Sequence, residues 1–201
     1  MNIWFATNNA HKKEELEAIL GRQLKIPADE GYNFNPDETG STFCENALIK
    51  ARELKKLTGL NDLVIADDSG LCVDALNGRP GVLSARYGAC EDKTSIVKPA
   101  SRQQNIMLLD ELGGSAARSA RFICAMVLMA DNGRFVVVQE TIEGEIVKKD
   151  GMKGAGGFGY DPVFYIREYG CTLAQLSQEE KNKISHRAKA GKLIASLLNN
   201  Y

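Results

Sequence analysis

The stretch Val64-Ile-Ala-Asp-Asp-Ser-Gly-Leu-Cys-Val-Asp74 decides how the fold and the chemistry of this chain are interpreted. Val64-Ile-Ala66 is typical of the apolar end of a buried strand, and Ser69-Gly70 is expected to break that strand. Two adjacent carboxylates, Asp67 and Asp68, lie between them, where burying an unpaired charge would be unfavourable. The pair predicts either a site for a divalent ion and a polarised water, or a turn in which Asp and Ser hydrogen-bond their own backbone.

Length and charge restrict the class of protein. A chain of 201 residues is long enough for one large domain or two small lobes. Its 25 basic and 26 acidic residues give a formal charge of -1, unlike the basic field of a nucleic-acid-binding protein. The longest apolar runs are too short to span a bilayer, and the first residues do not resemble a signal peptide. We therefore expect a cytoplasmic protein that binds neither nucleic acid nor membrane.

The cysteines and histidines restrict the kind of metal site. Five cysteines are scattered singly, without a C-x-x-C pair, which argues against a disulfide scaffold or a zinc site and for a reducing compartment. His11 and His186 are the two histidines of the chain, so an all-imidazole site is not expected. Any metal is predicted to be a hard ion bound by oxygen ligands.

A polar loop near the N-terminus is a candidate phosphate site. Thr7-Asn8-Asn9-Ala10-His11-Lys12 connects a predicted strand over 2–7 to a predicted helix over 12–20, closed by Gly21. Free backbone N–H groups at a helix start, with a lysine nearby, meet the requirements of a phosphate cradle. The loop lacks the glycines and the Lys-Ser/Thr pair of a Walker sequence. The alternative is that Asn9 only caps the helix.

A second helix carries further candidates. Thr42-Phe-Cys-Glu45 predicts a capping box, followed by an amphipathic helix to about Gly59. Glu38, in the loop before this helix, could reach a metal, although a solvated loop acid is the default. Lys50 lies on the polar side of the helix, where lysines are ordinarily surface residues.

The middle of the chain predicts mostly structural elements. We expect a strand over 24–28, a turn over 77–81, a surface loop over 89–99, a helix over 101–112 and a hairpin of strands 122–130 and 135–141. Asp131-Asn132-Gly133 is the predicted tight turn of that hairpin, and 144–147 could extend its sheet.

Two C-terminal stretches offer groups to a planar ligand. Residues 151–161 are dense in glycine, which lets the backbone approach a ligand, and Phe158 or Tyr160 is offered as a stacking surface. The alternative is a loop whose aromatic side chains pack onto the core. Ser177-Gln-Glu-Glu180 is a capping signal for a closing helix, and His186-Arg187 could donate hydrogen bonds from its start.

Six motifs in this order resemble those of the inosine/xanthosine triphosphate pyrophosphatase family of non-standard purine nucleotide hydrolases. They span nearly the whole chain: Thr7-x-Asn9-x-x-Lys12, Glu38-Thr-Gly-x-Thr-Phe-x-Glu-Asn46, Asp67-Asp-Ser-Gly70, Pro80-Gly-x-x-Ser-Ala-Arg86, Gly157-Phe-Gly-Tyr-Asp-Pro162 and Glu180-Lys-x-x-x-Ser-His-Arg187. One departure is Asn8, where the family usually has glycine. Asn tolerates left-handed backbone angles better than most residues, so the loop is expected to survive.

The resemblance implies the fold, the activity and the assembly. The fold would be α/β, with two lobes around a long mixed β-sheet flanked by helices and the active site in the cleft between the lobes. Residues 1–201 would form one such domain without a separable linker. The activity would be hydrolysis of ITP, dITP and XTP to the monophosphate and pyrophosphate by a Mg²⁺-dependent homodimer.

The resemblance also implies roles for individual residues. Residues 7–12 would hold the triphosphate, Glu38 and Asp68, with Asp67, would hold Mg²⁺, and Asp68 would activate water for attack at the α-phosphorus. Ser69 would bind a phosphate oxygen, and Lys50 would be a further phosphate or dimer contact, as would Arg86. The base would lie in the 158–161 segment, stacked on Phe158. The substrate-binding residues of that segment are Phe158, Gly159, Tyr160 and Asp161, and the donors to the base edge are Lys181, His186 and Arg187.

Two rival functions remain. A pyrophosphatase for modified pyrimidine nucleotides would share the phosphate chemistry but should lack the Ser-His-Arg residues at the base edge. A catalytically silent nucleotide-binding module would not need the acids Glu38, Asp67 and Asp68, all of which are present.

Overall fold

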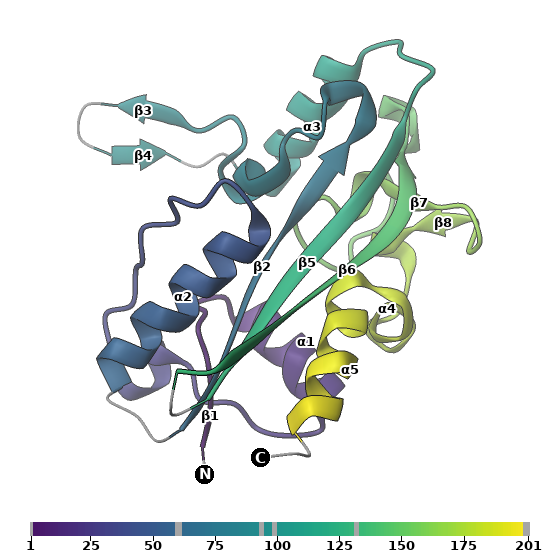
Figure 1. Cartoon of the computed structure of the whole chain (residues 1–201). Helices are drawn as coiled ribbons and strands as arrows, with labels where there is room; N and C mark the ends of the chain where they lie inside the picture. Colours follow the sequence, from purple (N-terminus) through teal and green to yellow (C-terminus); the bar gives the residue numbers. More distant parts are fainter. Residues whose placement is uncertain (1, 59–61, 93–94, 98–99, 131–132, 199–201) are drawn as a thin grey trace. The chain divides into compact units, whose positions relative to one another are not determined.

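The chain folds into two compact units of α/β structure (Figure 1). The computed structural model describes residues 2–58, 62–92, 95–97, 100–130 and 133–198. The first unit comprises Met1–Ser69, Ile123–Thr141 and Ile184–Tyr201, and the second comprises Gly70–Phe122 and Ile142–Lys183. Within the described residues, the helices are all too short or too polar to cross a bilayer.

A mixed six-stranded sheet is the framework, with the strand order β1-β2-β5-β6-β7-β8. β1 pairs with β2 in parallel, whereas β6 pairs with β7, and β7 with β8, in antiparallel orientation. The α/β class with a mixed sheet and flanking helices, expected from the sequence, is confirmed. The strands are β1 (Ile3–Phe5), β2 (Leu63–Val73), β5 (Ser119–Met129), β6 (Phe135–Ile146), β7 (Phe164–Ile166) and β8 (Cys171–Thr172).

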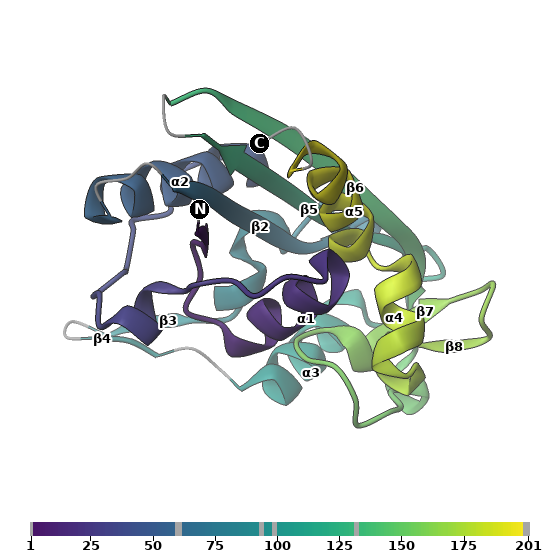
Figure 2. The same ribbon diagram turned by 90° about the horizontal axis from the view of Figure 1, so that it is seen from below.

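In the first unit, the sheet is covered on both faces. Its helices are α1 (Ala10–Leu20), α2 (Phe43–Thr58) and α5 (His186–Leu198). Leu63 and Ile65 of β2 pack into an apolar cluster with α1 and α5, whereas Val64 and Ala66 pack into another with α2. Successive residues of a strand point to opposite faces, so β2 sends alternate side chains into two cores. Figure 2 shows α1 and α2 on opposite sides of β2.

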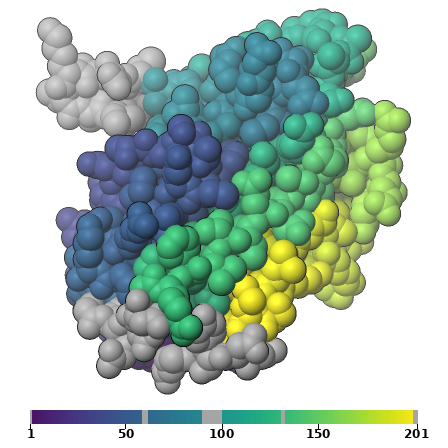
Figure 3. Space-filling view, viewed as in Figure 1, coloured from purple at the N-terminus to yellow at the C-terminus, as the bar shows by residue number. Residues whose placement is uncertain are grey.

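The packing of α1 against α5 requires a small residue. A Cβ atom on Gly191 of α5 would lie 2.8 Å from Ile19 Cγ2 of α1, closer than carbon atoms approach. On the face shown in Figure 3, β6 runs between α2 and α5. Two contacts agree with that view: the Arg52 guanidinium lies 5.9 Å from the Phe135 ring centre, and Lys189 Nζ donates to the Thr141 carbonyl over 2.8 Å.

Local sequence signals explain where these helices begin and end. The Asn9 side chain caps α1 by accepting from the backbone N–H of Lys12, and Gly21 ends the helix in a left-handed conformation. Thr42 and Glu45 exchange hydrogen bonds at the start of α2, which confirms the predicted capping box.

The second unit contains α3 (Ser101–Leu112) and, up to Lys183, α4 (Gln178–Ile184). The rings of Phe122 and Phe164 pack within it, with 4.7 Å between their centres. A small antiparallel sheet of β3 (Cys90–Asp92) and β4 (Ser95–Val97) belongs to the same unit. The remaining helical segments of the described chain are single 3₁₀ turns or short 3₁₀ runs at Pro27–Glu30, Asp74–Leu76, Gly81–Arg86, Lys149–Gly151, Asp161–Val163 and Leu173–Gln175.

Three sequence predictions about the fold are wrong. Ser69-Gly70 does not break β2, because the strand continues to Val73 and buries Leu71 and Val73. Residues 24–28 form one bridge between Lys25 and Trp4 and then enter a 3₁₀ turn at Pro27, whose ring suits a helix start. The expected loop over 89–99 contains β3 and β4. The predicted turn at Asp131-Asn132 and the helix end near Gly59 lie outside the described residues.

Candidate active site

Asp67 and Asp68 belong to different side-chain clusters of the first unit. Asp67 lies on the same face of β2 as Leu63 and Ile65, the face that packs against α1 and α5. Asp68 lies on the other face with Val64 and Ala66, which packs against α2. Both are buried, with exposed fractions of 1% and 7%. Two carboxylates in the interior of a strand each need a cation or donors, and the protein supplies a separate set to each.

Asp68 shares a lysine with Glu38. Lys50 Nζ lies 3.0 Å from Asp68 Oδ1 and 2.9 Å from Glu38 Oε1, and its side chain is buried. Asn46, one helical turn before Lys50, donates to Asp68 Oδ2 over 3.2 Å and accepts from the Gly40 backbone N–H over 2.8 Å. The fully buried Asn46 therefore joins the loop that carries Glu38 to the strand that carries Asp68.

The electrostatics of this cluster suit a proton acceptor. Burial raises the pKa of Asp68 above its ordinary value of 3.8, because the charged carboxylate is poorly solvated; Lys50 opposes the shift and Glu38 adds to it. Burial alone would lower the pKa of Lys50, but the charges of Asp68, Asp67 and Glu38 raise it above its ordinary value. Asp68 is thus a more basic carboxylate than a free one and lies beside a charged lysine.

Asp67 is held by two cations on the other face. Lys12 Nζ lies 3.0 Å from Asp67 Oδ1, and Arg187 binds Asp67 Oδ2 through Nη2 at 3.1 Å and Nε at 3.3 Å. Arg187 also donates to the buried Glu15 over 2.6 Å and to the hydroxyl of Ser69 over 2.9 Å. Its exposed fraction is 2%.

This second cluster stays ionised. Burial would raise the pKa of Asp67, but Lys12, Arg187 and Lys50 outweigh it and hold the pKa well below its ordinary value. Burial would likewise lower the pKa of Arg187, yet Asp67 and Glu15 raise it. The neighbouring Cys124 thiol is buried among these groups, and burial together with the charge of Asp67 raises its pKa to about 12. Asp67 is therefore a permanent charge, unsuited to accepting a proton.

The loop from Thr7 to Lys12 lies between β1 and α1 of the same unit. Thr7 Oγ1 accepts from the Asn9 backbone N–H over 3.1 Å, and Asn8 donates to the Phe34 carbonyl. Ala10 and His11 are exposed in the first turn of α1. Asn77 is the one non-glycine residue with a positive φ in the described chain, so Asn8 does not need the left-handed conformation that we considered for it. The capping role of Asn9 is confirmed, and phosphate binding by this loop stays a prediction.

A cation–aromatic cluster lies in the second unit. Lys181 Nζ lies 4.7 Å from the centre of the Phe158 ring and 2.9 Å from Asp161 Oδ2. The same carboxylate oxygen accepts from the Phe158 backbone N–H over 2.8 Å. Lys181 and Asp161 are buried, and Phe158 is half-buried. The structure thus brings Phe158, Asp161 and Lys181 together, and their role towards a base stays a prediction.

Tyr160 differs from Phe158. Its side chain is 4% exposed, its hydroxyl donates to the Ser84 carbonyl over 2.9 Å, and burial raises its pKa. It packs onto the core, as the alternative interpretation of this stretch expected. Phe158 is therefore the better stacking surface of the two.

Two of the predicted base-edge donors lie at the start of α5. His186 is buried at the start of α5 in the first unit, next to Arg187. Arg187 was expected to donate to a base edge, but it binds three oxygen-bearing side chains of its own unit. The role of Arg187 at a purine edge stays a prediction. Its described contacts support a structural role, in which it holds Asp67 in place.

The donors fit a divalent ion between two carboxylates rather than three. Among the described residues, no group of three or more His, Cys, Asp or Glu side chains could hold a metal. Glu38 and Asp68 do converge on one point, because the Lys50 ammonium binds both of them there. Two oxygen ligands with open positions suit a hard ion that keeps water and substrate oxygens. The expected third ligand, Asp67, is directed to the opposite face and neutralised by Lys12 and Arg187.

Sequence reasoning missed three buried residues that organise these clusters: Glu15, Asn46 and Asn105. Glu15 lies one helical turn after Lys12 and therefore on the same side of α1, which was an available signal. Asn46 likewise precedes Lys50 by four residues, on the same side of α2, and it ends the motif that begins at Glu38. Asn105 has no such local signal, because it binds a loop far away in sequence.

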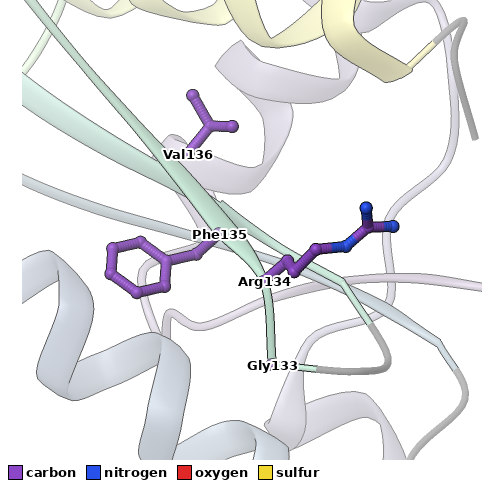
Figure 4. Close-up of a pocket in the computed structure, with 4 residues that line it drawn as sticks. All are labelled: Gly133, Arg134, Phe135 and Val136. Carbon is purple, nitrogen blue, oxygen red and sulfur yellow. The ribbon is translucent and has the colours of Figure 1, made fainter.

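A shallow pocket elsewhere in the first unit does not carry this chemistry. It is lined by Gly133, Arg134, Phe135 and Val136 at the start of β6, and the Arg134 and Phe135 side chains point away from each other (Figure 4). None of these residues is an acid, and none belongs to the two clusters described above.

The fold and the site define an α/β protein that buries a carboxylate–lysine cluster between strand β2 of a mixed sheet and helix α2. The sequence model of the Ham1 family matches residues 3–197, and the chain belongs to this family. A dITP/XTP pyrophosphatase of Treponema denticola is 48% identical over 191 residues, covering 94% of each chain. A dITP/XTP pyrophosphatase of Bacillus licheniformis is 45% identical, covering 98% of this chain and 97% of that one.

A solved structure agrees with this assignment. The structure of a HAM1 protein from Coxiella burnetii superimposes with a TM-score of 0.85 at 36% identity and covers 100% of both chains. The resemblance inferred from the six motifs is thereby confirmed at the level of the family.

Proposed function

We propose that this protein hydrolyses non-standard purine nucleoside triphosphates, namely ITP, dITP and XTP, to the nucleoside monophosphate and pyrophosphate. Membership of the Ham1 family and the names of its close relatives support this activity. The single structural observation that carries it is the convergence of Glu38 and Asp68 on Lys50 within a buried part of the first unit. A silent binding module would have no need for a carboxylate of raised pKa in this position.

In the proposed reaction, Asp68 accepts the proton of the attacking water. The water oxygen forms a bond to the α-phosphorus on the side opposite the oxygen that bridges the α- and β-phosphorus atoms. The bond from the α-phosphorus to this bridging oxygen breaks, and the oxygen leaves with the pyrophosphate. Burial gives Asp68 a higher pKa than a solvated aspartate, before the charge of any bound metal is counted. Lys50 provides a positive charge that can move from the carboxylates to phosphate oxygens, since its side chain is flexible.

Glu38 and Asp68 are the residues that would hold a divalent ion, which we propose to be Mg²⁺. When bound, such an ion neutralises phosphate charge and lowers the pKa of a bound water. Asp67 has no place among these ligands in the proposal. Asp67 instead holds Lys12 and Arg187 by hydrogen bonds on the face of β2 that packs against α1 and α5.

The remaining residues would bind the substrate. Backbone N–H groups of residues 7–12 and the positive end of α1 suit the triphosphate, and the Ser69 hydroxyl suits one of its oxygens. Phe158 would stack on the purine, and Lys181 and His186 would donate to its edge. We further propose a cytoplasmic homodimer, on the resemblance alone.

Release of pyrophosphate from ITP in the presence of Mg²⁺ is the decisive test. We expect turnover of ITP, dITP and XTP by the parent and its loss in Asp68→Asn. Turnover of modified pyrimidine nucleotides in preference to ITP would support the pyrimidine alternative, and binding of nucleotide without turnover would support a silent module.

A further inference from the structure

One buried side chain of α3 holds the loop that carries Phe158. Asn105 Nδ2 donates to the carbonyl of Gly159 over 3.1 Å, and both residues belong to the second unit. The side chain of Asn105 is buried, with an exposed fraction of 2%. Its other polar atom, Oδ1, has no hydrogen-bond partner in the part of the chain that the structure describes.

The loop needs such an anchor because its backbone is irregular. Gly154, Gly157 and Gly159 have positive φ values, and no helix or strand covers residues 152–160. Gly157 also approaches Asp161 so closely that a Cβ atom there would lie 2.1 Å from Asp161 Oδ2. The direction of the peptide planes around Phe158 is therefore set by individual hydrogen bonds rather than by a regular ladder.

Gly159 lies in the sequence between Phe158, which carries the aromatic ring, and Asp161, which binds the Phe158 backbone. Phe158 precedes it, and Asp161, which binds both the Phe158 backbone N–H and Lys181, follows two residues later. The bond from Asn105 to the Gly159 carbonyl fixes the peptide between them. A change at Asn105 would therefore be transmitted to the ring of Phe158 and to the Asp161–Lys181 pair at the same time.

A half-satisfied buried amide is an unfavourable choice for stability alone. Oδ1 makes no hydrogen bond within the described chain, whereas a leucine, which has the same number of side-chain heavy atoms, would bury no polar atom there. The amide does provide one thing that leucine does not, namely a donor for the Gly159 carbonyl. The geometry thus indicates a role in placing the loop.

We propose that Asn105 is a positioning residue for purine recognition. It does not touch the nucleotide; it holds the Gly159 carbonyl and thereby sets Phe158, Asp161 and Lys181 in the arrangement that binds the base. This inference rests on the proposed function, in which Phe158 stacks on the purine.

Gln104 provides a matched control on the same helix. Its side chain is also buried, with an exposed fraction of 6%, and its amide donates to the Tyr87 carbonyl over 3.2 Å and to the Ala85 carbonyl over 3.5 Å. It therefore ties α3 to a different segment of the second unit. Gln104→Leu removes a buried amide from α3 but no direct hydrogen bond to the glycine-rich loop.

The test compares the parent, Asn105→Leu and Gln104→Leu for ITP, for ATP and for inorganic triphosphate, which has the charged tail but no base. We expect Asn105→Leu to raise the KM for ITP about tenfold and to leave kcat within about threefold. Inhibition by inorganic triphosphate should stay unchanged, and the preference for ITP over ATP should fall. Gln104→Leu should change none of the substrate parameters.

Three results would overturn the proposal. They are an unchanged KM for ITP in folded Asn105→Leu, an equal weakening of ITP and inorganic triphosphate, and the same substrate effects in Gln104→Leu. Should Asn105→Leu fail to fold, Asn105→Ala is subject to the same criteria. A parent that releases no pyrophosphate from ITP would reject the proposed function instead, and calorimetric binding of ITP to parent and variants would then test Asn105 independently.

Discussion

Asp67 and Asp68 are consecutive residues of β2, and their carboxylates bind different lysines on opposite faces of the strand. Lys12 of α1 lies 3.0 Å from Asp67, and Lys50 of α2 lies 3.0 Å from Asp68. The alternation of a β-strand thus gives one acid a permanent charge and the other a raised pKa. Adjacent positions in the sequence therefore have different chemical roles, and each role can be tested separately.

Substitution of the two aspartates should separate catalysis from stability. Asp68→Asn removes the proton acceptor, so we expect turnover of ITP to fall at least about a hundredfold while the protein stays folded. Asp67→Asn leaves the Arg187 and Lys12 charges without their carboxylate, so we expect a lower free energy of unfolding. Turnover and denaturant unfolding of both variants check this. Full turnover in Asp68→Asn with none in folded Asp67→Asn would reverse the assignment.

Arg187 should contribute mainly to stability through Asp67 and Glu15. Removing one partner of a buried ion pair is destabilising by about 3–5 kcal/mol, because an unpaired charge remains. We therefore expect Arg187→Ala to destabilise strongly, and the double variant Asp67→Asn/Arg187→Ala to lose less than the sum of the single losses. Additive losses in urea unfolding would show that the two residues are not coupled.

The protein should prefer ITP over ATP, because the two bases carry different hydrogen-bonding groups at ring position 6. Hypoxanthine has an oxygen acceptor at ring position 6, whereas adenine has an amino donor there, and Lys181 can only donate. An unpaired donor costs roughly 1–3 kcal/mol, so one or two mismatches give discrimination on the order of a hundredfold. Rates with ITP, XTP and ATP measure this for the parent. Equal turnover of ATP and ITP would leave a general nucleotide pyrophosphatase.

The metal requirement should follow from oxygen ligands. Glu38, Asp68, phosphate and water are hard donors, so we expect Mg²⁺ to support turnover and Zn²⁺ to support it poorly. Glu38→Gln should weaken Mg²⁺ activation, whereas Glu45→Gln, on the same segment but bound to Ser41, should not. Activity that survives thorough chelation would remove the metal from the mechanism.

Cys124 should make stability fall at alkaline pH. Its folded pKa of about 12 is raised above the ordinary value of 9.0, so the folded state holds the thiol proton more tightly than the unfolded state. The stabilising contribution is complete below pH 9 and is lost as the pH rises towards 12. We expect Cys124→Ala to show a smaller fall in unfolding free energy between pH 8 and about pH 10. An identical fall in parent and variant would contradict the burial of the thiol.

Local sequence signals predicted the helices well because their information is short-range. The cap at Asn9, the box at Thr42 and Glu45 and the glycine after Leu20 each act within a few residues. The strand through Asp67-Asp-Ser-Gly70 was predicted to stop because these residues favour turns. Burial of Leu71 and Val73 and pairing within the sheet outweighed that preference.

The sequence predicted which residues form the candidate site better than it predicted how they are arranged. Motifs indicated Glu38 and Asp68, Lys50 was a further candidate outside the motifs, and the structure brings these three together. The separation of Asp67 from them follows from the strand register, which requires knowing that the strand continues past Asp68. Asn105 could not be predicted, because its bond to Gly159 joins residues 54 positions apart.

The ion pair between Asp67 and Arg187 also determines an order of events during synthesis. The two residues are 120 positions apart, and α5, which carries Arg187, completes the first unit. Every residue of the second unit, from Gly70 to Lys183, leaves the ribosome before Arg187 does. As long as the chain ends before α5, Asp67 has Lys12 but not its arginine, so the buried cluster of the first unit cannot be completed until the last helix is made. Nascent chains that end before α5 should accordingly present an unfinished first unit to chaperones.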